Sequence, residues 1–300
     1  MDISVVIPVF NDIEGLTSCV EGLAAQQLDP ERFEVLVVDN GPLEGAENRL
    51  AEISRLLEKL TNGAAFHEPK PGSYAARNLA LQHAQGEVFA FTDADCIPTP
   101  EWLAAGLDFL NEHPDVAAAA GVIKLFPKDP TKRTAAELYE LRHGFQVQRY
   151  IETGSYGPTA NLFVRRTAID EIGPFDSNLR SGGDKEWGMR LKKHGGRLTY
   201  ASRAAVRHPA RRSLEELRLK AKRVVGGDLM IRRRQGWSRL NWLRYSLQPL
   251  RPPLRTIWRA RRDPLFTSKS ELVRYGGAFI LTRWMTSLYR LKALREWPAA

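Results

Sequence analysis

Apolar and polar residues alternate in blocks along the first hundred positions. Runs of β-branched and aromatic residues predict buried strands at 3–9, 33–38, 63–67 and 87–92. The stretches between them carry apolar residues at helical spacing and predict helices at 12–26, 44–60 and 73–84. Strands that alternate with helices of this length build βαβ units. The sequence therefore predicts an α/β fold with a mainly parallel sheet flanked by helices.

The pattern changes after residue 95. Thr99 and Pro100 are typical of a helix start, as cap and first residue. Further strands are predicted at 116–125, 160–164, 197–200 and 204–207. Further helices are predicted at 131–150, 167–172 and 184–194, with a Gly- and Ser-rich loop at 153–158. Near the C-terminus, helices are predicted at 212–235 and 269–297, on either side of a Pro- and Arg-rich stretch at 249–264.

The charge of the chain is divided unevenly. Residues 1–202 hold 20 Lys and Arg against 29 Asp and Glu, a net charge of −9, whereas residues 203–300 hold 24 against 6, a net charge of +18. This excess of cations indicates an anionic partner, either a membrane surface or nucleic acid. No nucleic-acid recognition motif accompanies the basic region, which makes nucleic acid the weaker alternative.

Composition narrows the class of protein. With 43% hydrophobic and 26% charged residues, the chain is typical of a globular protein. Cys19 and Cys96 match neither a metal-site spacing nor a disulfide framework, which favours a reducing compartment. The sequence shows no signal peptide, and its apolar stretches fall short of the ~20 residues that span a bilayer. We therefore expect a cytoplasmic protein, with a peripheral position on the cytoplasmic face of the membrane as an option for the basic region.

Two carboxylates follow the apolar run 87–92. Asp93 and Asp95 stand at the carboxyl end of this predicted strand, where open α/β sheets place their ligands. Paired acids repel each other unless a cation neutralises them. A divalent metal that holds substrate phosphates would do so, although Asp is also common in plain turns. The pair makes the chain a candidate for chemistry on a nucleoside diphosphate.

Polar residues also end the first two strands. Pro8, Val9 and Asn11 close the first run, and Asp39 closes the second. Pro8 has an alternative interpretation as the end of a ladder, and Asn11 as a helix cap. Asp39 is suited to accept hydrogen bonds from a base or a ribose, or to cap the turn that follows.

A third candidate feature is the start of the helix predicted at 73–84. Pro71, Gly72 and Ser73 form a turn that aims backbone N–H groups at an anion. Arg77, one turn further on, would reach a diphosphate there. The alternative is an ordinary helix start with a surface arginine.

Two glycines precede Asp184 at the start of another predicted helix. Asp184 is either a general base on a rigid helix end or a plain N-cap. Trp187, in the first turn, would offer a surface on which a sugar stacks. His208 follows a short strand and has arginines near it in the sequence. It is a candidate third metal ligand or phosphate contact, and the alternative is a lone surface histidine.

In this order and at these separations, the six pieces resemble the family 2 inverting glycosyltransferases with a GT-A fold. The resemblance covers about residues 1–210 and implies a Rossmann-like nucleotide-sugar-binding and catalytic domain at 1–210, with a basic helical extension at 211–300. It implies a hexosyltransferase-type enzyme that uses Mn²⁺ or Mg²⁺ and a nucleotide-sugar donor, most naturally a UDP-sugar. Surface polysaccharide or glycoconjugate synthesis is the implied setting.

The resemblance also implies a role for each candidate residue. Asp93-Ala94-Asp95 is similar to the DXD motif, in which Asp93 contacts the ribose or the metal shell and Asp95 binds the metal. His208 resembles a late metal-site histidine of some members. Asp184 is similar to the acid that deprotonates the acceptor hydroxyl. The family's donor-binding motifs are matched at Pro8, Val9, Asn11, Asp39 and Arg77. Among these, Asp39 is similar to the acid that contacts the nucleotide base.

Two positions depart from the family pattern. Gly183 stands where many members have Glu immediately before the base, which puts the role of that Glu in doubt here. Asn40 replaces the first residue of an Asp-Gly pair. The implied reaction is one in-line displacement: Asp184 takes the acceptor's proton while the acceptor oxygen attacks the anomeric carbon opposite the leaving group, so configuration inverts. No second carboxylate is needed as nucleophile.

The predicted helix at 269–297 combines apolar, aromatic and basic residues. Apolar residues near one face are Val273, Ile280, Trp284, Leu288 and Leu291, and the aromatics include Tyr275, Tyr289 and Trp297. The cations are Arg274, Arg283, Arg290, Lys292 and Arg295. This pattern is typical of an amphipathic helix on an anionic membrane, where a glycan or lipid-linked acceptor would lie. The alternative is packing on the catalytic domain or on a second subunit.

Two other functions fit parts of the sequence. A sugar nucleotidyltransferase also uses a nucleotide-binding α/β sheet, but residues 8–15 lack the early Gly-rich phosphate loop of that class. A non-catalytic scaffold for membranes or polyanions would keep a degenerate transferase domain. The presence of all four candidate acids, Asp39, Asp93, Asp95 and Asp184, argues against such degeneration.

Overall fold

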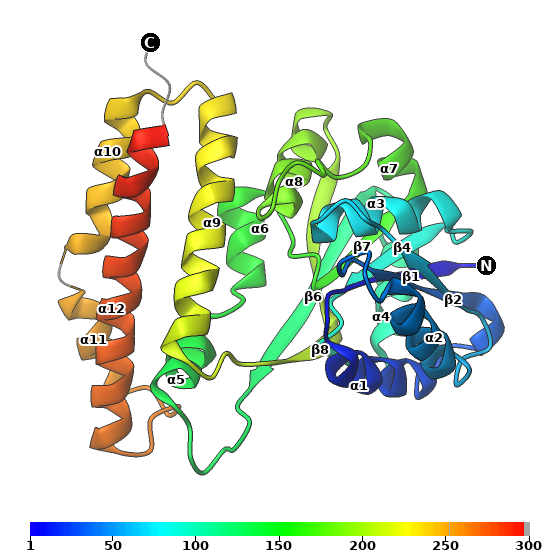
Figure 1. The fold of residues 1–300 in the computed structure, drawn as a ribbon, viewed down its shortest axis with the longest axis horizontal. Coiled ribbons are helices and arrows are strands. Elements are labelled where there is room, and N and C mark those ends of the chain that lie inside the picture. The colour runs from blue at the N-terminus through cyan, green and yellow to red at the C-terminus, as the bar shows by residue number, and fades with distance from the viewer. Residues whose placement is uncertain (252, 297–300) are drawn as a thin grey trace. The chain divides into compact units, whose positions relative to one another are not determined.

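The computed structural model describes residues 1–251 and 253–296 (Figure 1). Its central element is an eight-stranded mixed sheet with the order β3-β2-β1-β4-β7-β6-β8-β5. The strands are β1 (Ile3–Val9), β2 (Phe33–Asp39), β3 (Gly63–His67), β4 (Val88–Thr92), β5 (Ile97–Pro98), β6 (Val116–Phe126), β7 (Asn161–Arg165) and β8 (Arg197–Pro209). The first four strands run parallel, and β7 is antiparallel to β4 and β6. The predicted α/β class is confirmed.

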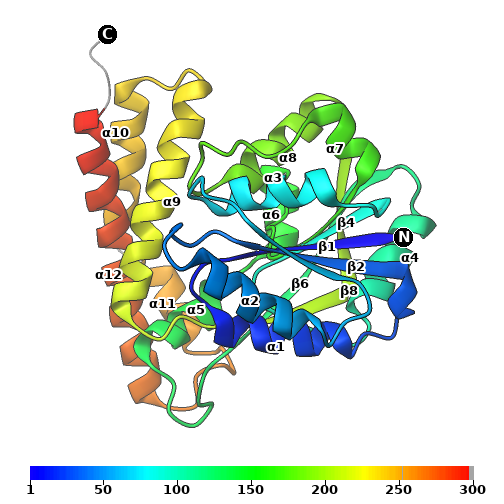
Figure 2. The ribbon, with the colours of Figure 1, turned by 45° about the vertical axis from the view of Figure 1, so that its right-hand side comes forward.

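Helices cover both faces of the parallel strands. The α-helices before β8 include α1 (Ile13–Ala24), α2 (Ala46–Leu57), α3 (Ser73–His83), α4 (Trp102–Glu112), α6 (Val147–Gly154), α7 (Arg166–Ile172) and α8 (Gly183–Lys193). Figure 2 shows α1 and α2 on one side of β1 and β2, and α3 on the other. Every residue of β2 and β4 is consequently buried. Burial on both faces explains why these strands are continuous apolar runs in the sequence.

Some predicted elements have different limits. The helix predicted at 131–150 is two helices, α5 (Ala135–His143) and α6, which Gly144 separates. The helix α6 also enters the loop predicted at 153–158. The strands predicted at 197–200 and 204–207 are one strand, β8, which continues through the exposed Ser202 and Arg203. Sequence periodicity missed the helix α10 (Arg239–Leu247), and α11 (Leu254–Ala260) lies inside the Pro- and Arg-rich stretch.

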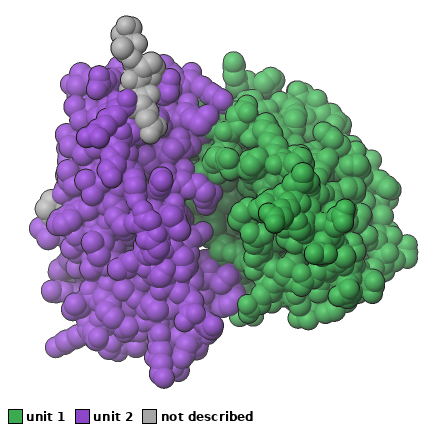
Figure 3. Space-filling view, viewed as in Figure 1, with its two compact units in different colours: residues 1–124, 145–208 green, residues 125–144, 209–300 purple. Residues whose placement is uncertain are grey.

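The chain divides into two compact units (Figure 3). Unit 1 comprises residues 1–124 and 145–208, and unit 2 comprises residues 125–144 and 209–300. The predicted division at 210 between a catalytic domain and a C-terminal extension stays a prediction. It lies close to the start of the C-terminal part of unit 2, but the sequence offered no signal that residues 125–144 pack with that part.

Unit 2 is helical, as predicted for the basic extension. It contains α5, α9 (Leu214–Arg234), α10, the short helix η2 (Gln248–Leu250), α11, α12 (Lys269–Ala293) and the short helix η3 (Leu294–Glu296). One apolar cluster joins α5, α11 and α12 around Leu138, Ala260, Tyr275 and Phe279. A second joins α9, α10 and α12 around Val225, Leu229, Trp242 and Ala293. Residue 297, the last of the predicted C-terminal helix, lies outside the described residues.

Buried ion pairs also tie α5 to the C-terminal helices. The carboxylate of Glu140 is only 1% exposed, and it accepts hydrogen bonds from Lys220 Nζ at 2.7 Å and Arg211 Nη1 at 2.9 Å. Arg133 pairs with Glu271 at 2.7 Å. Burial alone would raise the pKa of Glu140, but the charges of Lys220 and Arg211 outweigh burial and lower it. These pairs explain why a segment far from the basic region in the sequence belongs to its unit.

No helix among residues 1–251 and 253–296 is long enough and apolar enough to cross a membrane.

Replacing Glu140 by Ala should destabilise the protein, because two cations lose a buried partner. Arg211 and Lys220 remain partly exposed, so we expect a loss of about 2 kcal/mol in the free energy of unfolding, between the values for surface and buried pairs. Because the pKa of Glu140 is lowered in the folded state, this stability is present above pH ~4.3 and is lost as the pH falls further. Urea titrations at pH 7 and at about pH 3.5 measure both effects.

The control is Glu215→Ala, which removes an exposed partner of Arg218 and should change little at either pH. A Glu140→Ala protein as stable as the wild type at pH 7 would contradict the importance of this buried pair.

Candidate active site

The carboxyl ends of β1, β2 and β4 lie next to one another because these strands are parallel. Val9 and Asp39 are register partners at the ends of β1 and β2. The amide N–H of Asn40 extends the pairing by donating to the carbonyl of Val9 at 2.8 Å. The predicted strand-end residues therefore share one edge of the sheet in unit 1.

The end of β1 has the conformation that its residue types permit. Pairing of β1 with β4 ends at Val6. Pro8, which has no backbone N–H, therefore stands beyond the part of β1 that pairs with β4. Val9 is buried, and the exposed Asn11 has a positive φ of 51°, which Asn tolerates better than most residues. These residues form the sheet edge that precedes α1.

Asp39 is buried and firmly held. Its carboxylate accepts hydrogen bonds from Arg49 Nη2 at 3.0 Å and from the backbone N–H of Gly41 at 3.1 Å, and it contacts His67 Nδ1 at 2.8 Å. Burial would raise the pKa of Asp39, but the hydrogen bonds from Arg49 and His67 outweigh it and lower the pKa. Arg49 and His67 were not predicted, since nothing in their sequence context links them to Asp39.

Asn40 clamps the loop that leads into α3. Its side-chain N–H₂ donates to the carbonyls of Glu68 and Lys70, both at 2.8 Å. Its Oδ1 accepts from the amide of Gly72 at 2.6 Å. Only an amide side chain both donates twice and accepts here, which accounts for Asn in place of the Asp of the family pattern.

The first turns of α3 connect two of the predicted acids. Arg77 is 2% exposed and pairs with Asp93 at 2.5 Å. Tyr74, one turn earlier, has its hydroxyl 3.2 Å from Asp184 Oδ1. The guanidinium of Arg77 lies 5.5 Å from the centre of the Tyr74 ring. The sequence predicted Arg77 at this helix start but not Tyr74.

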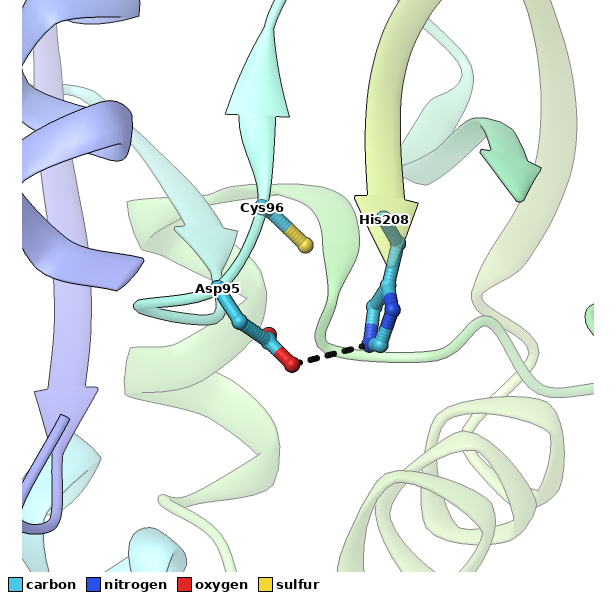
Figure 4. Close-up of side chains that lie close together, drawn as sticks. All are labelled: Asp95, Cys96 and His208. Carbon is cyan, nitrogen blue, oxygen red and sulfur yellow. Dashed lines mark ion pairs between the residues drawn. The ribbon is translucent and has the colours of Figure 1, made fainter. Parts of the chain in front are cut away.

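Asp95 and His208 come together through strand pairing. The short strand β5 is antiparallel to β8, with Ile97 opposite Arg207, so the residues just before β5 lie beside His208. Asp95 Oδ2 is 3.5 Å from His208 Nε2. Figure 4 shows both side chains beside Cys96, and the possible ligand atoms of the three residues lie within 4.8 Å of one another.

The two acids of the predicted DXD motif thus point to different partners. The backbone N–H of Cys96 donates to the carbonyl of Asp93 at 3.0 Å, which closes a turn around Asp95. Asp93 contacts α3 through Arg77, whereas Asp95 contacts β8 through His208. Cys96, which was not predicted to lie in a site, has a pKa raised by burial and by both acids, and its Sγ donates to the carbonyl of Ala160 at 3.7 Å.

Asp184 is the second residue of α8, after Gly182 with a φ of 79° and Gly183. Its Oδ1 accepts from the backbone N–H of Lys185 at 2.8 Å. Burial raises the pKa of Asp184, against the opposing effects of that hydrogen bond, the charge of Arg77 and the Tyr74 hydroxyl. A carboxylate with a raised pKa is suited to accept a proton.

Trp187 does not fit its predicted contact with the acceptor. Its side chain is fully buried, it lies against Phe175, and its Nε1 donates to the carbonyl of Gly173 at 3.0 Å. An indole without exposed surface offers no face to a sugar in this structure. The first-turn position suggested exposure, but α8 turns this side toward the core.

Comparison with known proteins agrees with the geometry. Residues 4–173 match the family model for glycosyl transferase family 2. Glycosyltransferase AglE of Haloferax volcanii is 34% identical over 229 residues, which are 76% of this chain and 73% of that protein.

Two solved structures share the fold. The mannosyltransferase PcManGT of Pyrobaculum calidifontis, in complex with GDP-Man and Mn²⁺, has a TM-score of 0.58 at 19% identity, with coverage of 99% of this chain and 76% of that chain. TarS of Staphylococcus aureus, in complex with UDP-GlcNAc, has a TM-score of 0.56 at 21% identity, with coverage of 99% and 92%.

Fold and site together define a glycosyltransferase of the GT-A class that takes its sugar from a nucleotide donor. The chain belongs to glycosyl transferase family 2. The predicted family, fold and enzyme class are thereby confirmed, and a glycosyltransferase is favoured over the nucleotidyltransferase and scaffold alternatives. The roles of the individual site residues stay predictions.

Replacing Asn40 by Asp removes two amide donors and turns a carboxylate toward the carbonyls of Glu68 and Lys70. Leaving polar groups without partners costs about 1–3 kcal/mol. We therefore expect Asn40→Asp to lower the free energy of unfolding by about 2 kcal/mol, measured by urea titration. Asn111→Asp, at an exposed position on α4, is the control and should unfold like the wild type. Equal stability of both variants would refute the clamp.

Proposed function

We propose that this chain is a metal-dependent, inverting glycosyltransferase. It moves a sugar from a nucleoside-diphosphate donor, most naturally a UDP-sugar, to a hydroxyl of a glycan or lipid-linked acceptor in surface polysaccharide or glycoconjugate synthesis. The observation that carries the proposal is the arrangement of three acids in unit 1. Asp93 pairs with Arg77, and Asp95 pairs with His208. Asp184 is near enough to Asp93 and Arg77 for their charges to affect its pKa.

Asp95 and His208 are the proposed metal ligands. One carboxylate and one imidazole suit Mn²⁺, whereas Mg²⁺ prefers oxygen ligands alone. We leave Cys96 out of the ligand set, because its thiol is buried and donates to a backbone carbonyl. A bound Mn²⁺ would neutralise the charge that develops on the leaving diphosphate. The Mn²⁺ in the PcManGT complex supports this choice.

The proposed donor site follows the shared strand edge. Arg77 Nε is buried and has no hydrogen-bond partner among the described residues, which leaves a donor for the diphosphate beside Asp93. His67 Nε2 likewise has no hydrogen-bond partner within the described part of the chain. It adds a polar atom next to Asp39, the proposed contact of the nucleotide base. Pro8, Val9 and Asn11 would line the same edge. The UDP-GlcNAc in the TarS complex supports UDP as the nucleotide.

Asp184 is the proposed general base. It would take the proton of the acceptor hydroxyl while the acceptor oxygen forms a bond to the anomeric carbon. The bond from that carbon to the diphosphate oxygen breaks at the same time, and the nucleoside diphosphate leaves with the electron pair. Attack from the opposite face inverts the configuration. A positioned base of this kind contributes about 10²–10⁴-fold to the rate.

Asp95→Ala and His208→Ala should remove metal-dependent donor binding, because each deletes one proposed ligand. With wild-type protein we expect UDP to raise the melting temperature only when Mn²⁺ is present, since ligands stabilise the folded state that binds them. Both variants should lose this shift and should release UDP from UDP-sugars at least about 100-fold more slowly. A thermal-shift series with UDP, GDP, Mn²⁺, Mg²⁺ and EDTA, followed by a UDP-release assay, measures this.

Asp184→Asn is the matched control, since it removes an acid outside the metal site. It should keep the Mn²⁺-dependent thermal shift and lose UDP release. Undiminished UDP release by Asp95→Ala would defeat the metal assignment, and a larger thermal shift with GDP than with UDP would change the donor class.

The basic helices of unit 2 are the proposed membrane contact. One face of α12 packs on α5, α9 and α10 of the same unit. Another face is exposed and apolar, with Val273 74%, Leu281 43%, Trp284 52% and Leu288 56% exposed. On α11, Leu254 and Trp258 are exposed among arginines. Apolar side chains surrounded by cations match an anionic lipid surface, and we propose attachment at the cytoplasmic face.

Replacing Trp284 and Leu288 by Glu should abolish binding to anionic vesicles, because it removes apolar contacts and adds negative charge. We expect the wild type to float with vesicles of phosphatidylserine and phosphatidylcholine but not with phosphatidylcholine alone. Leu43→Glu, at an exposed apolar position in unit 1, should float like the wild type. If the wild type does not float, or if light scattering shows a dimer that the double variant dissociates, the membrane proposal is wrong.

A further inference from the structure

Tyr74 forms two hydrogen bonds with one residue, Asp184. The backbone N–H of Asp184 donates to the Tyr74 hydroxyl at 3.2 Å, and the hydroxyl donates to Asp184 Oδ1 at 3.2 Å. The ring is only 5% exposed and lies 5.6 Å from the ring of Phe175 and 5.5 Å from the guanidinium carbon of Arg77. A hydroxyl fixed in this way holds both the backbone and the carboxylate of Asp184.

The space that the Tyr74 ring fills is available only because residue 183 is glycine. A Cβ atom at position 183 would lie 2.7 Å from Tyr74 Cε2 and 2.8 Å from Cδ2 and Cζ, closer than real Cβ contacts. Many members of the family that the sequence resembles have Glu at this position. The ring of Tyr74 therefore fits here because residue 183 is glycine. It approaches Asp184 from the space that a Glu side chain at position 183 would need.

Charged groups act on Asp184 from two other elements. Arg77 on α3 favours its ionised form, and Asp93, at the end of β4, disfavours it. On α8 itself, the backbone N–H of Lys185 donates to the same Oδ1. The hydroxyl of Tyr74 favours the ionised carboxylate, against the burial that raises the pKa of Asp184.

We propose that Tyr74 is the positioning residue for Asp184, fixing Oδ1 so that Oδ2 receives the proton of the acceptor. The inference rests on the proposed role of Asp184 as base. Tyr74 touches neither reacting bond, and it acts through the orientation and the ionisation of the carboxylate.

Tyr74→Phe is the direct test, because it keeps the ring, its contact with Phe175 and its stacking under Arg77. A hydrogen bond to a charged group is worth about one to two pH units of pKa. We expect the acidic limb of the kcat/KM profile for UDP release to move up by about one pH unit. Below the limb the rate should fall about 10-fold, and UDP affinity with Mn²⁺, measured by calorimetry, should not change. Tyr200→Phe, on β8, is the control and should leave the profile unchanged.

A second variant tests the link to residue 183. Gly183→Ala presses on the Tyr74 ring and should lower the rate at acidic pH in the wild type. In the Tyr74→Phe background, where no hydroxyl contact remains to be lost, it should have little further effect. Circular dichroism confirms that each variant is folded.

The outcomes separate this inference from the proposed function. An unchanged acidic limb in Tyr74→Phe, an equal loss at every pH, or additive losses in the double variant would overturn the role of Tyr74 alone. Full UDP release by Asp184→Asn would instead show that Asp184 is not the base, and the proposed function would fail with it.

Discussion

The site depends on how the first turns of α3 are held. Asn40, at the end of β2, fixes the loop before the helix by three hydrogen bonds. The helix then carries Arg77 to Asp93 and Tyr74 to Asp184. Because Tyr74 and Arg77 stand three residues apart, they share one face of the helix. A displacement of this turn would separate the acid that follows β4 from the acid that opens α8.

Strand pairing positions the two proposed metal ligands in a similar way. Asp95 follows a parallel strand at the centre of the sheet, whereas His208 stands near the end of β8. The two residues of β5 pair with β8 and bring the turn of Asp95 to the imidazole. Sheet hydrogen bonds fix this distance more closely than loops do, which suits the metal site that we propose for these two residues.

The basic part of the chain has two kinds of side-chain environment. Some cations are structural: Arg211 and Lys220 neutralise the buried Glu140, and Arg290 lies 3.5 Å from the centre of the Tyr245 ring. The exposed apolar residues of α11 and α12 lie on the surface of the same unit. The net charge of this region therefore does not all serve an external partner, and the number of cations alone would overstate the attraction to an anionic surface.

Periodicity alone determined the alternating strands and helices and the positions of Asp39, Asp93 and Asp95 at strand ends. Such patterns are local, and parallel strands bring their carboxyl ends to one edge whatever their exact packing. The tertiary structure decided that Trp187 faces the core, that α5 joins the C-terminal helices, and that Tyr74 reaches Asp184 across 110 residues of sequence. These contacts depend on which helix faces pack together, and that information is distributed over the whole chain.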